Sequence, residues 1–351
     1  MTSPGFAHRV VRWQRLHGRH ELPWQGTRDA YRIWLSEVML QQTQVATVIP
    51  YYERFLARFP TVADLARASE EEVLALWSGL GYYARGRNLL HAARVVAQLR
   101  GGRFPDRYED LVELPGVGRS TAGAIAAIST GERRAILDGN VRRVLARHAG
   151  IAGDPASAAT LAKLWSIAEA RLPARDIGAY TQGMMDLGAQ VCTARRPACA
   201  SCPVASDCVA RIEDRVALLP GKRVRGVAKR RRIAMLVVLA RGEVLLERRA
   251  PAGIWGGLWS LPEADAESDP ARILARDWGL AASSARALPP FDHAFTHFTL
   301  EVQPWLLTPR KPSTLAAQRT ATWLALSELD GAALPSPVRK LLKMVSDTDF
   351  R

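Results

Sequence analysis

The chain has 351 residues and a hydrophobic fraction of 48%, which is enough for two or three domains that each bury a core. Its formal net charge of +14 favours a polyanionic partner, with nucleic acid as the first candidate, although an arginine-rich composition alone would give the same charge. No run reaches the roughly 18 apolar residues that cross a membrane, and the N-terminus lacks the apolar core of a signal peptide. We therefore expect a cytoplasmic protein with no membrane partner.

Residues 1–218 are predicted to form a helical domain. Apolar residues recur at spacings of three and four in the segments 61–78, 87–99 and 158–170, which is typical of helices with one buried face. Glycine and proline pairs separate these segments.

A glycine-rich turn at 114–122, with the sequence LPGVGRSTA, separates two helical patterns. Gly116, Val117 and Gly118 leave backbone amides open to an approaching group, and a helix starting near Ser120 adds its positive end. This arrangement can hold a DNA phosphate without distinguishing sequence. A turn that only joins two helices would also use glycine, so the function of the turn stays open at this point.

Two carboxylates are candidates for catalysis. Asp138 stands between apolar Leu137 and a helical pattern, so it is expected to cap that helix and can also face a developing cation. Glu37 would share a helix face with Gln41 and Gln44, whose amides can hydrogen-bond to base edges. Taken alone, each residue has an ordinary alternative, as a helix cap and as a surface glutamate.

All four cysteines of the chain fall within seventeen positions: Cys192, Cys199, Cys202 and Cys208, spaced C-x6-C-x2-C-x5-C. Four thiolates so close together indicate a zinc ion or an iron–sulfur cluster. Zinc bound by four thiolates usually has two C-x2-C pairs, whereas here there is one. A disulfide is less favoured, because the chain does not look like a small secreted domain.

Residues 219–345 differ from the first 218 in composition and in the spacing of their apolar residues. Residues 219–232 form a basic segment, expected to be a linker that either follows a phosphate backbone or is a solvated hinge. Residues 233–345 are predicted to form a separate α+β domain. A strand at 233–239, a turn at 241–243 and a strand at 244–246 form a hairpin pattern, and 298–302 alternates like a half-buried strand.

Several strings resemble the MutY family of adenine DNA glycosylases, within the endonuclease III or helix-hairpin-helix superfamily. They are LPWQ (22–25), WLSEVMLQQTQV (34–45), GLGYYARGRNL (79–89), LPGVGRSTAGAI (114–125), LDGNVRRVLAR (137–147), MMDLGAQVC (184–192) and the cysteine spacing. The resemblance covers residues 8 to 215 and continues more weakly beyond. It implies a multidomain fold: an all-α helix-hairpin-helix half, with a central helical barrel at about 25–130 and a 4Fe–4S cluster loop at 192–208, followed by a Nudix-like domain that recognises the lesion.

The resemblance also implies roles for individual residues. Glu37 would protonate adenine at N7 and direct water, while Asp138 would stabilise the cationic sugar with help from Asn140. The other implied roles are Arg19, Trp24 and Gln182 in the adenine pocket, and Gln42 and Tyr82 as wedges in the duplex. The adenine must leave the base stack to reach such a pocket.

The lysine content predicts that the product strand stays intact. Superfamily members that cut the strand use a lysine directly after the hairpin to form a Schiff base, and this position is Ser120 here. Only Lys163 precedes residue 222, and it is far in sequence from both carboxylates. Some relatives have tyrosine at the Ser120 position, so any aromatic contact there would be absent.

The C-terminal domain resembles a Nudix fold that has lost its metal-binding carboxylates. The string 257–263 resembles the start of a Nudix box, but Ile273, Arg276 and Asp277 occupy the positions of its glutamates, too few carboxylates to hold magnesium well. Phe295, Thr296 and His297 match the loop with which the family recognises 8-oxoguanine.

Together these features predict a monomeric, nucleoid-associated enzyme acting on double-stranded DNA with adenine opposite 8-oxoguanine or guanine. Three alternatives remain: a sister glycosylase acting on thymine or oxidised pyrimidines, a non-catalytic iron–sulfur DNA-binding protein, and a Nudix hydrolase with a DNA-binding appendage.

Overall fold

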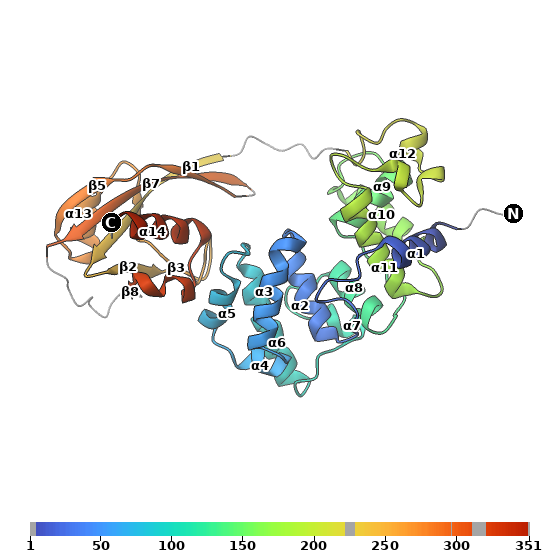
Figure 1. The fold of residues 1–351 in the computed structure, drawn as a ribbon, viewed down its shortest axis with the longest axis horizontal. Coiled ribbons are helices and arrows are strands. Elements are labelled where there is room, and N and C mark those ends of the chain that lie inside the picture. The colour runs from blue at the N-terminus through green and yellow to red at the C-terminus, as the bar shows by residue number, and fades with distance from the viewer. Residues whose placement is uncertain (1–4, 222–228, 296, 311–320, 350–351) are drawn as a thin grey trace. The chain divides into compact units, whose positions relative to one another are not determined.

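The computed structural model describes residues 5–221, 229–295, 297–310 and 321–349 (Figure 1). Internal contacts divide the chain into two compact units. Unit 1 comprises Met1–Arg67 and Asn88–Val224, and unit 2 comprises Ala68–Arg87 and Arg225–Arg351. Among the described residues, none of the helices is both long and apolar enough to span a membrane.

Residues 5–221 are helical wherever they form regular secondary structure. The helices are α1 (Phe6–His17), α2 (Ala30–Leu40), α3 (Val45–Arg58), α4 (Val62–Arg67), α5 (Glu70–Trp77), α6 (Ala84–Leu99), α7 (Tyr108–Leu111), α8 (Arg119–Ser129), α9 (Gly139–His148), α10 (Ala158–Ala170), α11 (Ile177–Asp186), the π-helix η1 (Leu187–Val191), the short 3-10 turns η2 (Cys199–Ser201) and η3 (Ala205–Asp207), and α12 (Val209–Ile212). The predicted helices at 61–78, 87–99 and 158–170 are confirmed, with a break between α4 and α5.

Apolar side chains of unit 1 are buried between its helices. Trp34 of α2 and Phe55 of α3 are fully buried. A hydrophobic core lies among α1, α9, α10 and α11, where Val11, Leu145 and Leu164 pack together. Because α9 places its apolar residues at helical spacing on one side, burying that side fixes the helix that begins after Asp138.

The glycine-rich turn lies between α7 and α8, as predicted. Gly116 has a positive φ of +78°, a conformation that costs glycine little, and a Cβ there would lie 2.9 Å from the Cβ of Asn88. Gly118 then caps the N-terminus of α8. Glycine at 116 is therefore required by the backbone itself, whatever else the turn does.

Unit 2 is built on a mixed β-sheet. Its strands and helices are β1 (Lys229–Ala240), β2 (Glu243–Arg248), β3 (Trp259–Ser260), β4 (Glu263–Asp265), α13 (Pro270–Trp278), β5 (Ala282–Ala287), β6 (Phe291–Ala294), β7 (Phe298–Pro309), β8 (Ala321–Ala325), the 3-10 helix η4 (Leu326–Gly331) and α14 (Ser336–Asp349). The main strand order is β3-β2-β1-β7-β5; β4, β6 and β8 pair with β1, β7 and β2.

The apolar run in β1 follows from its central position. β1 is parallel to β7, with Ile233 opposite Val302, and residues 233–238 are all buried. Such a continuous run is typical of a parallel strand covered on both faces. Leu274 of α13 packs on this region, and Figure 1 shows α13 and α14 beside the sheet.

The predicted hairpin is confirmed. β1 and β2 pair antiparallel around Arg241 and Gly242, which both have positive φ, as a tight two-residue turn requires. The predicted strand at 298–302 is the start of β7, where Leu300 and Val302 are fully buried. β1 begins at Lys229, inside the segment expected to be a linker, because Lys229–Arg232 pair with the first residues of β7.

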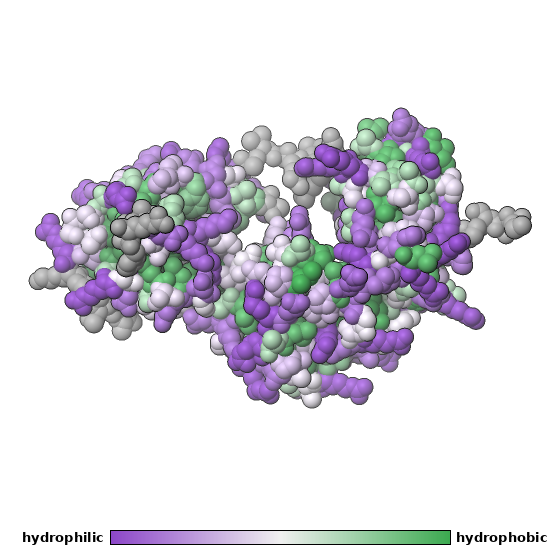
Figure 2. Space-filling view, in the orientation of Figure 1, coloured by the Kyte–Doolittle hydropathy of each residue, from purple (hydrophilic) through white to green (hydrophobic). Residues whose placement is uncertain are grey.

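The surface is mainly hydrophilic on the face shown in Figure 2, with small separate apolar patches. Exposed large apolar side chains include Leu16, Leu99, Ile212 and Leu218. Isolated apolar side chains of this kind are normal on a soluble protein.

Candidate active site and iron–sulfur loop

Glu37 lies on α2, which Asp29 caps by accepting hydrogen bonds from the backbone N–H groups of Tyr31 and Arg32. Glu37 is half-buried and lines a cavity. Burial and, to a smaller extent, the nearby charge of Asp138 raise the pKa of Glu37 to about 8. Near neutral pH this side chain is therefore mostly protonated and can act as an acid.

Asp138 caps α9, as the sequence predicted, and its Oδ1 accepts a hydrogen bond of 2.8 Å from the Val141 N–H. Burial raises the pKa of Asp138 from its ordinary value, while hydrogen bonds from the backbone N–H groups of Val141 and Asn140 and the charge of Arg143 oppose the rise. The structure brings Asp138 close enough to Glu37 for the charge of one to affect the other. The two residues are thus neighbours, although a hundred positions separate them.

Asn140 and Ser120 each make a hydrogen bond next to Asp138, one to a side chain and one to the backbone. The Oδ1 of Asn140 accepts a hydrogen bond of 2.8 Å from Arg143, whose Nε also donates to the carbonyl oxygen of Cys192 at 2.7 Å. The Oγ of Ser120 accepts a hydrogen bond of 2.9 Å from the backbone N–H of Leu137, directly before Asp138. Both contacts fix the backbone around the carboxylate.

The cavity beside Glu37 has a volume of about 190 Å³. Its lining includes Arg19, Trp24, Gln25, Ser36, Glu37, Gly178 and Gln182. The three predicted pocket residues, Arg19, Trp24 and Gln182, therefore meet at this cavity with Glu37. Trp24 is buried and contacts Tyr52 edge to face, with ring centroids 5.4 Å apart, which fixes one wall.

Arg19 and Gln182 share a partner that the sequence analysis did not single out. Both donate hydrogen bonds to Asp186, which is fully buried at the end of α11. Asp186 stands in the string MMDLGAQVC, and an acidic residue between apolar neighbours was the signal that could have identified it.

Gln42 and Tyr82, the predicted wedges, have the same unusual backbone. Their φ angles are +59° and +48°, in the left-handed region that side chains other than glycine rarely adopt. Both side chains are exposed, Tyr82 to 47%. Strained, exposed residues of this kind often have a functional role, which fits contact with a ligand.

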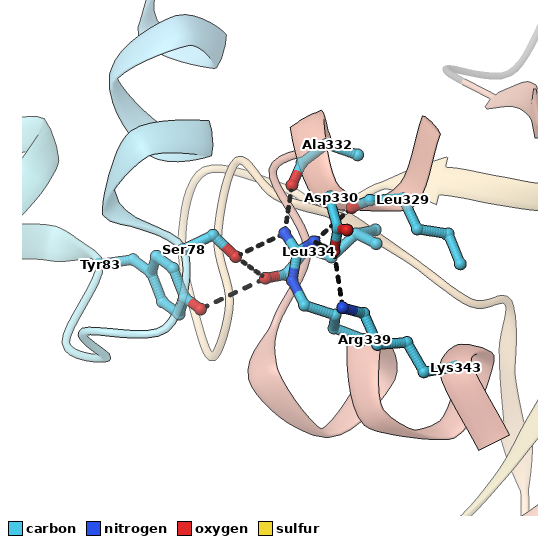
Figure 3. Close-up of polar contacts among 8 residues, drawn as sticks. All are labelled: Ser78, Tyr83, Leu329, Asp330, Ala332, Leu334, Arg339 and Lys343. Atoms are coloured by element: carbon cyan, nitrogen blue, oxygen red, sulfur yellow. Dashed lines mark hydrogen bonds and ion pairs between the residues drawn. The ribbon is translucent and has the colours of Figure 1, made fainter. Parts of the chain in front are cut away.

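The segment that carries Tyr82 is bound within unit 2 (Figure 3). The carbonyl oxygen of Leu334 accepts hydrogen bonds from Ser78 at 2.6 Å and from the buried Tyr83 at 3.4 Å. Farther along the segment, Arg87 donates to the carbonyl oxygen of Gly256 at 2.5 Å. Exposed Tyr82 therefore lies in a turn that the C-terminal domain holds on both sides.

The predicted lesion loop lies at an aromatic cluster. Phe295 stacks on Phe298 with centroids 4.6 Å apart and contacts His293 and Trp255 at 4.7 and 5.6 Å. His297 is exposed. Thr296 lies outside the described residues.

The four cysteines line one cavity, together with apolar Val144, Val191 and Val204. Burial raises the pKa of Cys202 to about 11 and also that of Cys208, so stable thiolates need positive charge nearby. Arg147 supplies some, donating to the Cys192 Sγ at 3.4 Å. A shared, mostly apolar cavity lined by four sulfur donors fits an iron–sulfur cluster, whose iron would supply the remaining charge.

Within the described ranges, no group of three or more His, Cys, Asp or Glu side chains is arranged to hold a metal ion. Two of the positions that correspond to glutamates of a Nudix box are Arg276 and Asp277, and these neighbours pair with each other at 2.6 Å. Gly279 ends α13 in a left-handed conformation.

Three family models match the chain. A model for the HhH-GPD superfamily base excision DNA repair protein covers residues 35–170, the iron-sulfur binding domain of endonuclease III covers 192–208, and a NUDIX domain covers 234–344. The predicted fold class and the 4Fe–4S cofactor are confirmed.

The curated relatives match almost the whole chain. It is 34% identical to the adenine DNA glycosylase of Buchnera aphidicola subsp. Acyrthosiphon pisum over 98% of each chain, and 36% identical to that of Mus musculus over 94% of this chain and 76% of that protein. A thymine-DNA glycosylase of Aeropyrum pernix is 35% identical but covers 57% of this chain.

Solved structures resemble the helical half. The structure of a thermostable thymine-DNA glycosylase matches 59% of this chain with a TM-score of 0.54 and 28% identity, over 95% of that chain. A non-covalent endonuclease III–DNA complex matches 59% of this chain and 94% of that chain with a TM-score of 0.50 and 21% identity, which shows the shared fold.

Proposed function

The chain belongs to the adenine DNA glycosylase family, and we propose that it hydrolyses the N-glycosidic bond of adenine mispaired with 8-oxoguanine or guanine in duplex DNA. Membership of this family means that the chain removes adenine in base excision repair. The observation that carries the mechanism is the coupled pair of carboxylates, Glu37 and Asp138, beside a cavity lined by Trp24, Arg19 and Gln182.

Glu37 supplies the proton for the leaving base. Adenine leaves poorly as an anion, so protonation at N7 lowers the barrier to breaking its bond to C1′. A carboxyl group with a pKa of about 8 holds its proton near neutral pH and donates it when the base enters the cavity. The resulting carboxylate can then direct water towards the sugar.

Asp138 stabilises the positive charge that develops on the sugar as the bond breaks. Its position at the N-terminus of α9 supports this role, because hydrogen bonds from Val141 and Asn140 hold the carboxylate in one orientation. Asn140 is in turn held by Arg143. Transient covalent attachment of the sugar to Asp138 is compatible with the same geometry.

The product is an abasic site in an intact strand. Strand cleavage would need an amine that attacks the sugar, and the residue after the hairpin is Ser120, whose hydroxyl is engaged with the Leu137 N–H. Lys163 is exposed on α10. Trapping with borohydride on abasic DNA should therefore be weak, and trapping as efficient as that of a true lyase would contradict this assignment.

The glycine-rich turn at 114–122 binds the DNA backbone, and the C-terminal domain recognises the lesion. The amides at Gly116 and Gly118 bind a phosphate, supported by the turn geometry and the adjoining N-terminus of α8. The Val117 N–H, which was also predicted to be open, donates to the carbonyl oxygen of Leu114 at 3.0 Å. Phe295, Thr296 and His297 recognise 8-oxoguanine, supported by the aromatic cluster around Phe295.

We also propose that the protein acts as a monomer, in the cytoplasm at the nucleoid, because its substrate is chromosomal DNA. The main alternative is a glycosylase acting on thymine or oxidised pyrimidines, favoured by the likeness of the helical half to a thymine-DNA glycosylase. That likeness does not extend to the C-terminal domain, since the Aeropyrum pernix protein aligns with only 57% of this chain.

One assay separates these functions. The protein is incubated with duplexes that contain adenine opposite 8-oxoguanine, guanine, cytosine or thymine, and with duplexes that contain a thymine mispair; abasic sites are then revealed by alkali. We expect cleavage at adenine opposite 8-oxoguanine and guanine only, and none with Glu37→Gln, which should still bind the mispair within about tenfold. Cleavage at thymine, or unchanged turnover by Glu37→Gln, would overturn the proposal.

A further inference from the structure

Asp186 is a fully buried acidic residue that is hydrogen-bonded to two residues of the cavity wall, Arg19 and Gln182. Its Oδ1 accepts from the Arg19 Nε at 2.7 Å and from the Gln182 Nε2 at 3.0 Å, and it lies 2.5 Å from the Arg19 Nη2. Its Oδ2 accepts from the backbone N–H of Arg19 at 3.0 Å. The exposed fraction of Asp186 is 0%.

The backbone is shaped to allow this contact. Gly18 approaches so closely that a Cβ would lie 2.5 Å from the Gln14 carbonyl oxygen and 3.2 Å from the Asp186 Oδ2. On the other side, α11 ends at Asp186 and the helix continues as the π-helix η1 from Leu187. Single π-turns of this kind are frequent at functional sites.

The contacts of Asp186 determine which way the amide of Gln182 is turned. A buried carboxylate is tolerated when it is paired, and the guanidinium of Arg19 provides that pairing. The Oδ1 of Asp186 accepts from the Nε of Arg19 and from the Nε2 of Gln182. Gln182 must therefore direct its NH2 group at Asp186, and its carbonyl oxygen Oε1 is the end of the amide that can meet a ligand.

This orientation selects the chemistry of the base. An acceptor in the cavity wall favours a purine with a donor at C6, such as the exocyclic amine of adenine, and opposes one with a carbonyl there, such as hypoxanthine. A site that hydrogen-bonds one group rejects analogues that cannot complete the bond. We propose that Asp186 is a positioning residue that sets specificity for a 6-amino purine by fixing the amide of Gln182.

This proposal rests on the proposed adenine excision and is tested through Asp186→Leu. The guanidinium of Arg19 and the amide of Gln182 both donate to Oδ1, so asparagine could keep an oxygen at that place and leave Gln182 unturned. Leucine removes the acceptor, so the amide of Gln182 can turn and offer its NH2 group to the cavity. The measured quantity is the ratio of single-turnover excision rates for adenine and hypoxanthine, each opposite 8-oxoguanine.

We expect Asp186→Leu to lower this ratio at least tenfold, because an amide that can turn accepts a 6-oxo purine better and selects adenine less. Asp106→Leu is the matched control: it makes the same change at an exposed aspartate outside the cavity lining, so its ratio should stay within about threefold of wild type. A merely structural role for Asp186 predicts equal losses on both bases, and that result would overturn the proposal, as would a tenfold fall with Asp106→Leu.

A second variant keeps the test valid should Asp186→Leu fold poorly. Gln182→Met removes the amide while leaving the pair of Arg19 and Asp186 intact, so the ratio must again fall at least tenfold; an unchanged ratio contradicts the proposal. Failure of the proposed function is distinguishable, because the wild-type protein would then release no adenine from any duplex.

Discussion

Arg339 of α14 donates a hydrogen bond to Ser78 at the end of α5, with Nη2 3.0 Å from Oγ, although 261 positions separate the two residues. The same nitrogen donates to the carbonyl oxygen of Ala332 at 2.7 Å, and Nη1 donates to that of Leu329. One mostly buried guanidinium thus joins the C-terminal helix to the turn that carries Tyr82 (Figure 3). We infer that the C-terminal domain holds the turn whose tyrosine is proposed to enter the duplex.

Replacing Arg339 by methionine should loosen the turn at residues 78–83. The variant keeps an unbranched side chain but leaves the carbonyl groups of Ala332 and Leu329 and the Ser78 hydroxyl without their charged donor. Hydrogen bonds to charged groups contribute about 1.5–3 kcal/mol, so amide hydrogen exchange in this turn should accelerate by roughly 10- to 100-fold.

Lys343→Met is the matched control, because Lys343 lies one turn later on α14 and pairs only at the surface with Asp330, at 2.7 Å. Exposed pairs contribute about 0–1 kcal/mol, so exchange at 78–83 should hardly change. Equal acceleration in both variants would show that the turn responds to helix α14 in general and not to the guanidinium.

The pH dependence of excision should have its alkaline limit at Glu37. Burial has raised the pKa of this acid to about 8, so its protonated form predominates below that pH and is lost above it. The value of kcat/KM should therefore fall about tenfold per pH unit above 8. On the acid side activity should fall as Asp138 is protonated, and burial places that loss at a higher pH than for an exposed aspartate. A rate that is still constant at pH 9.5 would exclude Glu37 as the acid.

The sequence predicted those parts of the site that depend only on residues next to one another in the chain. Asp138 before a helical pattern predicts a cap, and the glycine-rich turn predicts a break between helices; both depend on neighbouring residues only. The pKa of Glu37 could not be predicted, because it arises from burial by segments distant in the sequence.

The same limit applies to Asp186 and Ser78. Nothing local shows that Asp186 faces Arg19, 167 positions away, or that Ser78 meets the C-terminal helix. Packing between distant segments decides both contacts, so composition and periodicity carry no trace of them. Such residues support the site through contacts that only the folded chain shows.

Asp138→Asn separates the charge of this residue from its capping role. Asparagine caps helices about as well as aspartate, so the stability of the fold should change by less than about 1 kcal/mol. Base release should fall by roughly 10²- to 10³-fold, because a group placed to stabilise developing charge is removed. Single-turnover excision and thermal unfolding of the same preparations measure the two effects.

The control for this variant is Asp29→Asn, the same change at the cap of α2, where Oδ1 accepts from the Tyr31 N–H at 2.9 Å. Its excision rate should stay within about threefold of wild type. A rate within threefold for Asp138→Asn as well would remove Asp138 from the catalytic site. The charge of Asp138 raises the pKa of Glu37, so removing that charge should lower this pKa. The residual activity of Asp138→Asn should therefore begin to fall at a lower alkaline pH than that of the wild type.

His297→Ala tests the role of the C-terminal domain without disturbing its core. The side chain is exposed at the end of the loop beside Phe295, so truncation should leave thermal stability unchanged. If His297 contacts 8-oxoguanine, losing one hydrogen bond of about 0.5–1.5 kcal/mol should lower the preference for 8-oxoguanine over guanine by about two- to tenfold. Excision of adenine opposite guanine should be unaffected.

His91→Ala, at an exposed histidine of α6, provides the control for this variant. A loss of the same size on both mispairs with His297→Ala would assign His297 to general DNA binding instead of lesion recognition.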